Sequence, residues 1–185
     1  MEMHENGLSP PQRLAVAYAP AASRPALTLL LQFDARLADI VAGSTEPLIG
    51  QMKLAWWRDA LAAVSEQRPM GEPLIAQLEA MSGRQLEPAL LELIDAWETL
   101  LVADDLDEFA ERRGRAVYSA YAEWVGSTID VEALGTAWAK GSVGAPISND
   151  PALPKDRKLR PLTILALSVR NVSGPRLLWH ALTGR

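Results

Sequence analysis

The segment from Glu46 to Leu61, EPLIGQMKLAWWRDAL, places basic side chains on either side of two adjacent tryptophans. Such a helix is either an ordinary part of a core or one wall of a pocket for a charged, apolar substrate. The two tryptophans point about 100° apart on a helix and cannot face the same neighbour. We expect Trp57 to lie in the core and Trp56 to contact Lys53 one turn away through its ring face. Arg58 is a candidate for the pocket wall.

Asp34 is the one charged residue on an otherwise apolar helical stripe that runs from Leu27 to Val41. Burial of an unpaired carboxylate is costly, so Asp34 must be paired, hydrated or turned toward a polar cavity. The expected partners are Arg36, Lys53 and Arg58. A salt bridge within or between helices is preferred over a role in a functional site.

Most catalytic signatures are missing from the sequence. The absence of cysteine excludes disulfides, thiolate nucleophiles and the common structural zinc sites. The two histidines, His4 and His180, form no ligand motif, and there is no glycine-rich phosphate loop. The acidic run 104–108 is expected to begin a helix, because carboxylates favour the positive end of the helix dipole. Asp34 and Asp39 are rotated too far apart on a helix to share a magnesium ion.

Helices must position these side chains, because apolar residues recur at helical spacing along nearly the whole chain. Helices are expected at 23–41, 46–64, 73–81, 88–101, 109–125, 131–141, 160–171 and 175–184. The helix over 46–64 is apolar on two flanks and should therefore be surrounded by other helices. We predict an all-α fold, a single-domain helical bundle over residues 1–185, with an irregular connection at 145–158 and basic C-terminal helices at 159–185.

Charge is distributed unevenly along the chain. From Lys155 onward there are seven basic residues and one acidic residue, which leaves 11 of the 18 basic and 22 of the 23 acidic residues for the rest. We interpret this as complementarity between the C-terminal region and an acidic body, with peripheral contact to an anionic membrane as the alternative. No nucleic-acid partner is expected. With no secretory signal and no apolar run near the roughly 20 residues of a membrane span, we expect a cytoplasmic protein, at most peripheral to the inner membrane.

The run from Ala17 to Leu61 resembles the N-terminal part of the squalene/phytoene synthase family. The similarity continues through GEPLIAQLEAM, LELIDAWETLL and FAERRGRAVYSAYAEWVGSTID, and so covers about three-quarters of the chain. Pro20 and Arg24 match the proline and arginine ahead of the family's first inward-facing helix. The matches on later helices are Trp57, Arg58, Ile94, Asp95 and the segment from Tyr121 to Gly126.

This resemblance implies a truncated isoprenoid synthase fold. It also implies an activity, the head-to-head condensation of two prenyl diphosphates, with magnesium held by two aspartate-rich motifs. Magnesium neutralises the charge that builds as diphosphate leaves, and clustered carboxylates hold the ion. The first motif falls on residues 38–42, where only Asp39 remains, and a further family aspartate falls on Leu100. No counterpart of the second motif follows residues 131–141. We therefore expect no retained catalytic site, no metal site and no cofactor.

Three functional hypotheses follow. The first is a non-catalytic protein that binds a prenyl lipid or prenyl diphosphate, a protein partner, or both. Because the 46–61 helix looks similar to that of the complex I assembly factor branch of the family, this hypothesis includes a role in respiratory-complex assembly. The candidate pocket residues are Arg24, Asp34, Arg36, Lys53, Trp56, Arg58, Asp95 and Tyr121.

The second hypothesis is an active head-to-head prenyltransferase of isoprenoid biosynthesis. Magnesium would then be held by a rearranged site made of Asp39, Asp95 and the acidic run 104–108. The third hypothesis is a subunit that works only in a hetero-oligomer with a complete synthase. Fold alone does not decide among the three.

Overall fold

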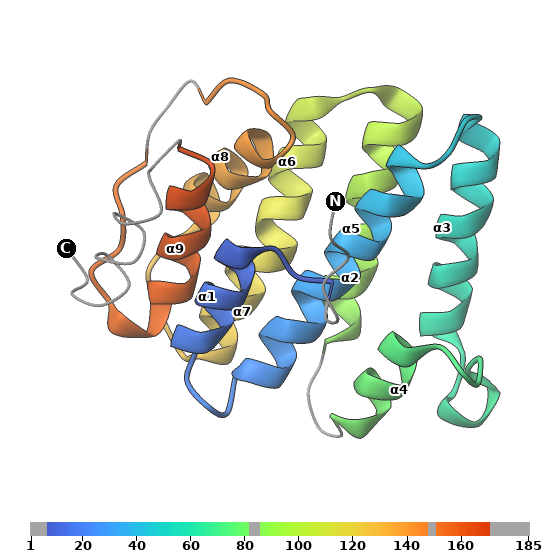
Figure 1. Cartoon of the computed structure of the whole chain (residues 1–185), viewed down its shortest axis with the longest axis horizontal. Helices are drawn as coiled ribbons and strands as arrows, with labels where there is room; N and C mark the ends of the chain where they lie inside the picture. Colours follow the sequence, from blue (N-terminus) through green and yellow to red (C-terminus); the bar gives the residue numbers. More distant parts are fainter. Residues whose placement is uncertain (1–6, 82–85, 148–150, 171–185) are drawn as a thin grey trace.

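The computed structural model describes residues 7–81, 86–147 and 151–170, and all regular structure in these ranges is helical (Figure 1). The all-α fold predicted from the sequence is confirmed. The helices are α1 (Pro10–Tyr18), α2 (Arg24–Ala42), α3 (Pro47–Ala62), α4 (Pro73–Ala80), α5 (Glu87–Ala103), α6 (Leu106–Gly114), α7 (Ala120–Trp124), α8 (Glu132–Ser142) and α9 (Arg160–Ser168). A π-helical turn, Arg115–Ser119, joins α6 to α7, and 3₁₀ turns occupy Ser65–Gln67 and Arg157–Leu159. None of the described helices is long and apolar enough to cross a membrane.

Local sequence signals account for most of the helix starts. Proline occupies one of the first two positions of α1, α2, α3, α4, α5 and α9, where its missing N–H costs nothing. Asp105 caps α6 by accepting hydrogen bonds from the backbone N–H groups of Asp107 and Glu108, at 3.1 and 2.9 Å. This confirms that the acidic run begins a helix. Ser23 precedes α2 without a side-chain cap hydrogen bond, and α1 is a helix that the sequence analysis did not predict.

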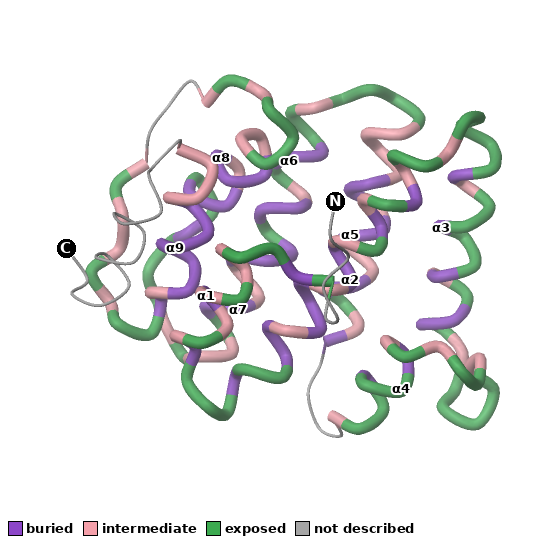
Figure 2. The backbone as a smooth tube through the Cα atoms, viewed as in Figure 1, coloured by how far each residue is buried: buried purple, intermediate pink, exposed green. Residues whose placement is uncertain are grey.

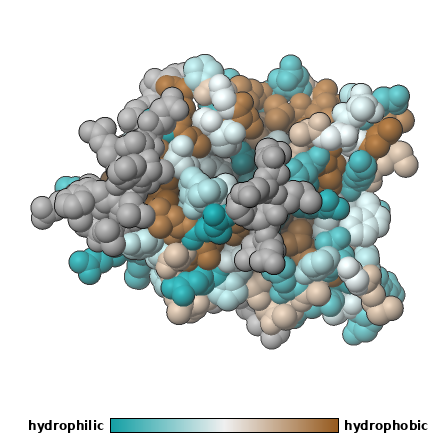
Figure 3. All heavy atoms as spheres, viewed as in Figure 1, coloured by the Kyte–Doolittle hydropathy of each residue, from teal (hydrophilic) through white to brown (hydrophobic). Residues whose placement is uncertain are grey.

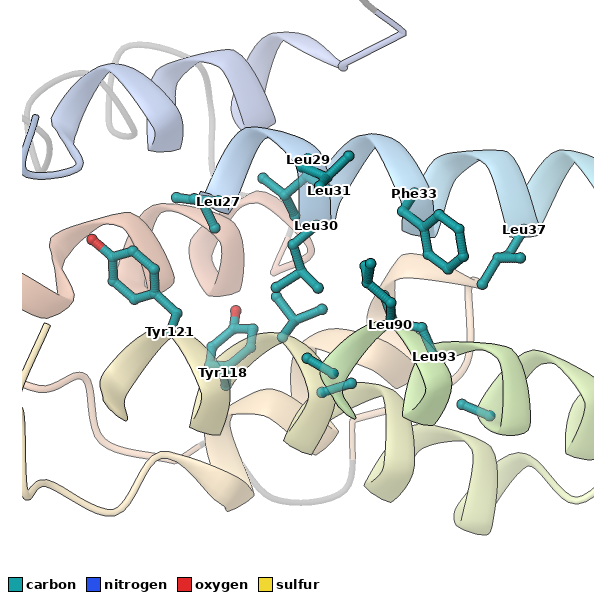
Figure 4. Close-up of a cluster of buried hydrophobic side chains, with 14 of the residues drawn as sticks. Leu27, Leu29, Leu30, Leu31, Phe33, Leu37, Leu90, Leu93, Tyr118 and Tyr121 are labelled. Carbon is teal, nitrogen blue, oxygen red and sulfur yellow. The ribbon is translucent and has the colours of Figure 1, made fainter. Parts of the chain in front are cut away.

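The core is organised around α2, the longest of the described helices. Its buried residues include a continuous run of leucines at positions 29–31, together with Leu27, Phe33 and Leu37. Figure 4 shows Leu30 and Phe33 on the side of α2 that faces Leu90 and Leu93 of α5 and the ring of Tyr118 in the π-helical turn, whereas Leu29 and Leu31 point to the opposite side. The helix is thus enclosed on most sides, which explains why its only buried charged residue, Asp34, needs a partner within the core.

Helices α6 and α8 approach each other at two glycines, Gly114 and Gly135. A Cβ atom added to Gly135 would lie 2.8 Å from the carbonyl oxygen of Gly114, and one added to Gly114 would lie 2.5 Å from the backbone of Gly135. Only residues without a side chain permit this contact. The close approach brings Arg113, the neighbour of Gly114, up to the C-terminal end of α8.

Helix α3 lies at one edge of the molecule (Figure 1). Its inner face is buried through Leu54, Trp57 and Leu61, and Figure 2 shows exposed positions along its outer side. The prediction that other helices surround α3 is therefore wrong within the part of the chain that the structure describes. Apolar periodicity identified both faces, but only one of them is covered.

The C-terminal region agrees with the sequence where the structure describes it. Residues 145–147 and 151–156 form no helix, as expected for the irregular connection. The first of the two basic C-terminal helices corresponds to α9, whose buried residues run from Pro161 to Ala166. The helix expected at 175–184 lies outside the described residues.

Candidate functional site

A groove of about 680 Å³ opens between the C-terminal half of α2 and the outer edge of α3. We call it the α2–α3 groove. Its lining is mainly apolar, with charged side chains among the apolar ones, and consists of Arg36, Asp39, Ile40, Ile49, Met52, Lys53, Trp56, Trp57 and Glu72. Four of the residues predicted from the sequence, Arg36, Asp39, Lys53 and Trp56, are brought together here.

The two cations of the groove have no acidic partner among the described residues. Neither Arg36 nor Lys53 forms a salt bridge with any described residue, although Asp39 and Glu72 lie in the same lining. Both side chains are exposed, so water solvates their charge in the free protein. Because neither cation is held in an ion pair by a described carboxylate, both are available to an anionic ligand.

The tryptophans of α3 divide as predicted between core and surface. Trp57 is 2% exposed and packs edge-on against Phe33, with ring centroids 5.1 Å apart. Trp56 is 44% exposed and contacts the ring of Trp57 at 5.0 Å. The expected contact between Lys53 and the ring of Trp56 is absent from the described interactions. Trp56 therefore gives the groove an accessible aromatic surface.

Asp34 is paired inside the core with a residue that the sequence analysis did not single out. The guanidinium of Arg113 donates two hydrogen bonds to it, from Nε to Oδ1 at 2.8 Å and from Nη2 to Oδ2 at 2.7 Å. The indole N–H of Trp97 donates a third to Oδ1, at 2.9 Å. The prediction that Asp34 pairs with Arg36, Lys53 or Arg58 is therefore wrong. Its partner, Arg113, lies on α6, 79 positions away in the sequence.

Three aromatic rings surround the guanidinium of Arg113. The Cζ atom of Arg113 lies 4.3 Å from the ring centroid of Trp138, 5.0 Å from that of Trp97 and 5.6 Å from that of Phe109. Its remaining N–H groups reach the carbonyl oxygen of Ala139 and the hydroxyl of Ser142 on α8. This buried cluster fills the space between α2, α5, α6 and α8. In the sequence, Arg113 is a single arginine on the apolar face of α6, just as Asp34 is a single aspartate on the apolar face of α2. That similarity was the signal that could have predicted their pairing.

A smaller hollow of about 350 Å³ opens beside this buried cluster. Asp34, Asp39, Arg113 and Ser142 contribute to its lining. Asp39 therefore borders both hollows. The carboxylate that remains from the first aspartate motif lies in the wall between them.

Arg58 and Asp95 pair with each other away from the groove. Nη2 of Arg58 lies 2.7 Å from a carboxylate oxygen of Asp95 and 2.7 Å from one of Glu98, which ties α3 to α5. The hydrogen bonds with Asp95 and then Glu98 raise the pKa of Arg58. Asp95 also lies 3.9 Å from Arg112. These side chains form a partly exposed ion-pair network rather than a pocket wall.

Arg24 and Tyr121 also lie outside the groove lining. Arg24 donates hydrogen bonds to the carbonyl oxygens of Ala17 and Ala19, at 3.1–3.3 Å, and so caps the C-terminal end of α1. Tyr121 is buried and donates to the carbonyl oxygen of Lys158 at 3.2 Å. Its burial raises the pKa of the phenol. Both residues stabilise the fold at other places.

The carboxylates proposed for a rearranged magnesium site do not converge. Asp95 is held by Arg58, Asp107 pairs with Lys140, and Asp105 caps α6. Asp39 lies on α2, beside the groove. Within residues 7–81, 86–147 and 151–170, no group of three or more His, Asp or Glu side chains could hold a metal ion. Magnesium needs several convergent oxygen ligands, and the described residues do not fit it.

Comparison with protein families gives one match, to the squalene/phytoene synthase family over residues 9–134. The matched range covers α1 to α7 and the start of α8, and it contains every residue of the α2–α3 groove. No curated protein and no solved structure matches the chain.

Proposed function

Because the chain belongs to the squalene/phytoene synthase family and has an apolar groove with two cations that form no salt bridge with any described residue, we propose that it binds a prenyl diphosphate without converting it. The observation that carries this proposal is the combination of side chains in the α2–α3 groove. Arg36 and Lys53 supply positive charge, whereas a single aspartate, Asp39, remains from the family's first metal-binding motif.

The groove offers a different surface to each end of such a ligand. Ile40, Ile49, Met52 and the ring of Trp56 present apolar area to a prenyl chain, whose burial is favourable in proportion to the area removed from water. Arg36 has a planar fork of donors that suits phosphate oxygens, and Lys53 adds a compact charge. Direct binding by side chains requires no metal ion.

The lack of convergent carboxylates supports binding without turnover. Loss of diphosphate from a prenyl carbon builds negative charge, and divalent ions are what the family uses to neutralise it. Of the acids of the second hypothesis, Asp95 pairs with Arg58, Asp107 pairs with Lys140 and Asp105 caps α6. Side-chain cations stabilise a bound diphosphate in its ground state, which lowers Kd without accelerating the reaction.

Calorimetric titration with farnesyl diphosphate in the presence of EDTA tests the binding. We expect saturable binding that Lys53→Ala and Arg36→Ala each weaken by about tenfold or more, because each removes a charge-assisted contact. Arg58→Ala is the matched control, since it removes a cation from the same helix outside the groove, and should leave Kd unchanged. Loss of binding in Arg58→Ala with full binding in Lys53→Ala would refute the assignment of the groove.

A second assay tests the absence of turnover. The protein is incubated with farnesyl diphosphate and magnesium, and released pyrophosphate is measured. We expect no release above that of a protein-free control. Release that disappears in Asp39→Asn would show that the remaining carboxylate supports catalysis, and the non-catalytic proposal would fail even if the groove binds the ligand.

A further inference from the structure

A larger hollow, of about 760 Å³, opens on another part of the surface, between α5, the π-helical turn, α7 and the start of α8. We call it the α5–α7 hollow. It shares no lining residue with the α2–α3 groove, whose apolar side chains reach the surface at the edge that α3 forms (Figure 3). Its volume lies in the range of small-molecule sites, so its lining was searched for a ligand of its own.

The charge of this hollow is mainly negative. Glu92 and Arg115 lie 3.4 Å apart in a salt bridge and so balance each other. Glu123 of α7 and Glu132 of α8 are exposed, and neither forms a salt bridge with any described residue. Two uncompensated carboxylates from different helices therefore border one hollow, which favours a cationic occupant.

A buried hydroxyl without a partner gives the hollow a third polar group. Ser119 belongs to the lining, and its Oγ is buried with no hydrogen-bond partner among the described residues. Buried hydroxyls are nearly always hydrogen-bonded, so an unpaired one calls for a partner from outside the chain. Ser119 also ends the π-helical turn, a distortion of the helix that is frequent at functional sites. A ligand N–H that donates to Oγ would supply the missing bond.

The remaining walls are small or aromatic. Pro88 and Ala89 of α5 line one side, and Ala116 and Ala120 line the other, so short side chains leave the space between them open. The half-buried ring of Trp124 completes the lining. This ring forms no stacking or cation contact with any described residue. An aromatic face beside two carboxylates suits a cation that carries an apolar body.

We propose that the α5–α7 hollow binds an organic cation, a primary ammonium group on a short apolar body. The carboxylates of Glu123 and Glu132 neutralise its charge. One ammonium N–H donates to the free Oγ of Ser119, and the others are shared by the two carboxylates through charge-assisted hydrogen bonds. The apolar body packs between the small walls and the ring of Trp124, where burial removes its surface from water.

Other cations fit this lining less well. Magnesium needs several converging oxygen ligands, and no group of three or more acids that could hold a metal occurs among the described residues. A quaternary ammonium has no N–H group and leaves the hydroxyl of Ser119 unpaired. The primary ammonium is the cation that uses both the charge and the free acceptor.

Calorimetric titration of the full chain with 2-phenylethylamine, near pH 7 where the amine is protonated, tests the site. We expect saturable binding that Glu123→Gln and Glu132→Gln each weaken by about tenfold, because each removes a charge-assisted contact. Glu111→Gln is the matched control: Glu111 is an exposed acid of α6 outside the lining, and its change should leave Kd unaltered. Absence of saturable binding, or an equal loss in the control, would overturn the proposal.

Two analogues separate the roles of charge and hydrogen bonding. Neutral 2-phenylethanol should bind at least about tenfold more weakly than the amine, and equal binding would refute recognition of the charge. The trimethylated amine should bind the wild type more weakly than the primary amine, and Ser119→Ala should abolish this difference. Because the hydroxyl is unpaired in the free protein, Ser119→Ala should not lower the melting temperature. A lower melting temperature with unchanged amine binding would assign Ser119 a purely structural role and refute its contact with the ligand.

The amine site does not depend on the ligand of the groove. Lys53→Ala should weaken the titration with farnesyl diphosphate and leave that with 2-phenylethylamine unchanged, since Lys53 lies outside the α5–α7 hollow. Magnesium should not displace the amine. Displacement by magnesium would assign the hollow to a metal ion and refute the amine site, whatever the groove binds.

Discussion

At the scale of single residues, the pair formed by Asp34 and Arg113 is the most consequential contact in the described core. Both side chains are almost fully buried, and the carboxylate accepts three hydrogen bonds in all. A buried ion pair is tolerated only when such bonds replace the lost water. Breaking it leaves the other charge uncompensated in an apolar surrounding.

We predict that Asp34→Asn lowers the free energy of unfolding by about 3–5 kcal/mol, because it leaves the Arg113 guanidinium unpaired inside the protein. Urea unfolding followed by circular dichroism measures the loss. Glu108→Gln is the matched control, since it makes the same chemical change in the exposed pair with Arg112 and should cost less than about 1 kcal/mol. Similar losses in the two variants would contradict the importance of burial.

At the scale of helices, the contact of α6 with α8 depends on their two facing glycines. The same contact brings Arg113 to the carbonyl oxygen of Ala139 and the hydroxyl of Ser142. Glycine lowers the intrinsic stability of a helix, so the presence of Gly135 inside α8 has to be offset by packing. The close contact between the backbones of Gly135 and Gly114 provides this packing.

This contact makes the effect of Gly135→Ala predictable in sign. Helix propensity alone would stabilise the protein by up to about 1 kcal/mol. The added methyl group would instead meet the backbone of Gly114, and we expect a net destabilisation of about 1–3 kcal/mol. Thermal unfolding measures the change, and a raised melting temperature would show that the helices separate without cost.

The sequence predicted most helices but not how they meet. Proline starts and apolar periodicity located α2, α3, α4, α5, α8 and α9, because these signals are local. The partner of Asp34 could not be found in the same way, since Arg113 is distant in sequence and only the fold brings it near. For the groove, Arg36, Lys53 and Trp56 were identified by chemical type, whereas Arg58 and Asp95 turned out to satisfy each other.

At the scale of the whole molecule, two buried tyrosines connect the central helices to the C-terminal region. Tyr118 donates a hydrogen bond to the carbonyl oxygen of Leu162 at 3.1 Å, and Tyr121 does the same to Lys158. Burial raises the pKa of both phenols. In the unfolded chain a phenol ionises near pH 10, while in the folded protein these two keep their protons to higher pH.

Stability should therefore fall at alkaline pH. The unfolded state binds fewer protons than the folded state above about pH 10, so the contribution is complete below that pH and is lost as pH rises further. The urea concentration at the midpoint of unfolding should decrease as pH rises. In Tyr121→Phe this midpoint should decrease less steeply with pH than in the wild type. Identical slopes for the two proteins would exclude Tyr121 as a source of the effect.

The pairing of Asp34 with Arg113 also bears on how the chain is made. When a ribosome has released α2, the partner of its buried carboxylate is still to be synthesised, and Ser142 and Ala139 emerge later still. The nascent chain therefore carries an unneutralised acid on a leucine-rich helix over a long interval of translation. Until α6 and α8 appear, the contacts of that helix are incomplete, and its apolar face favours aggregation of the growing chain.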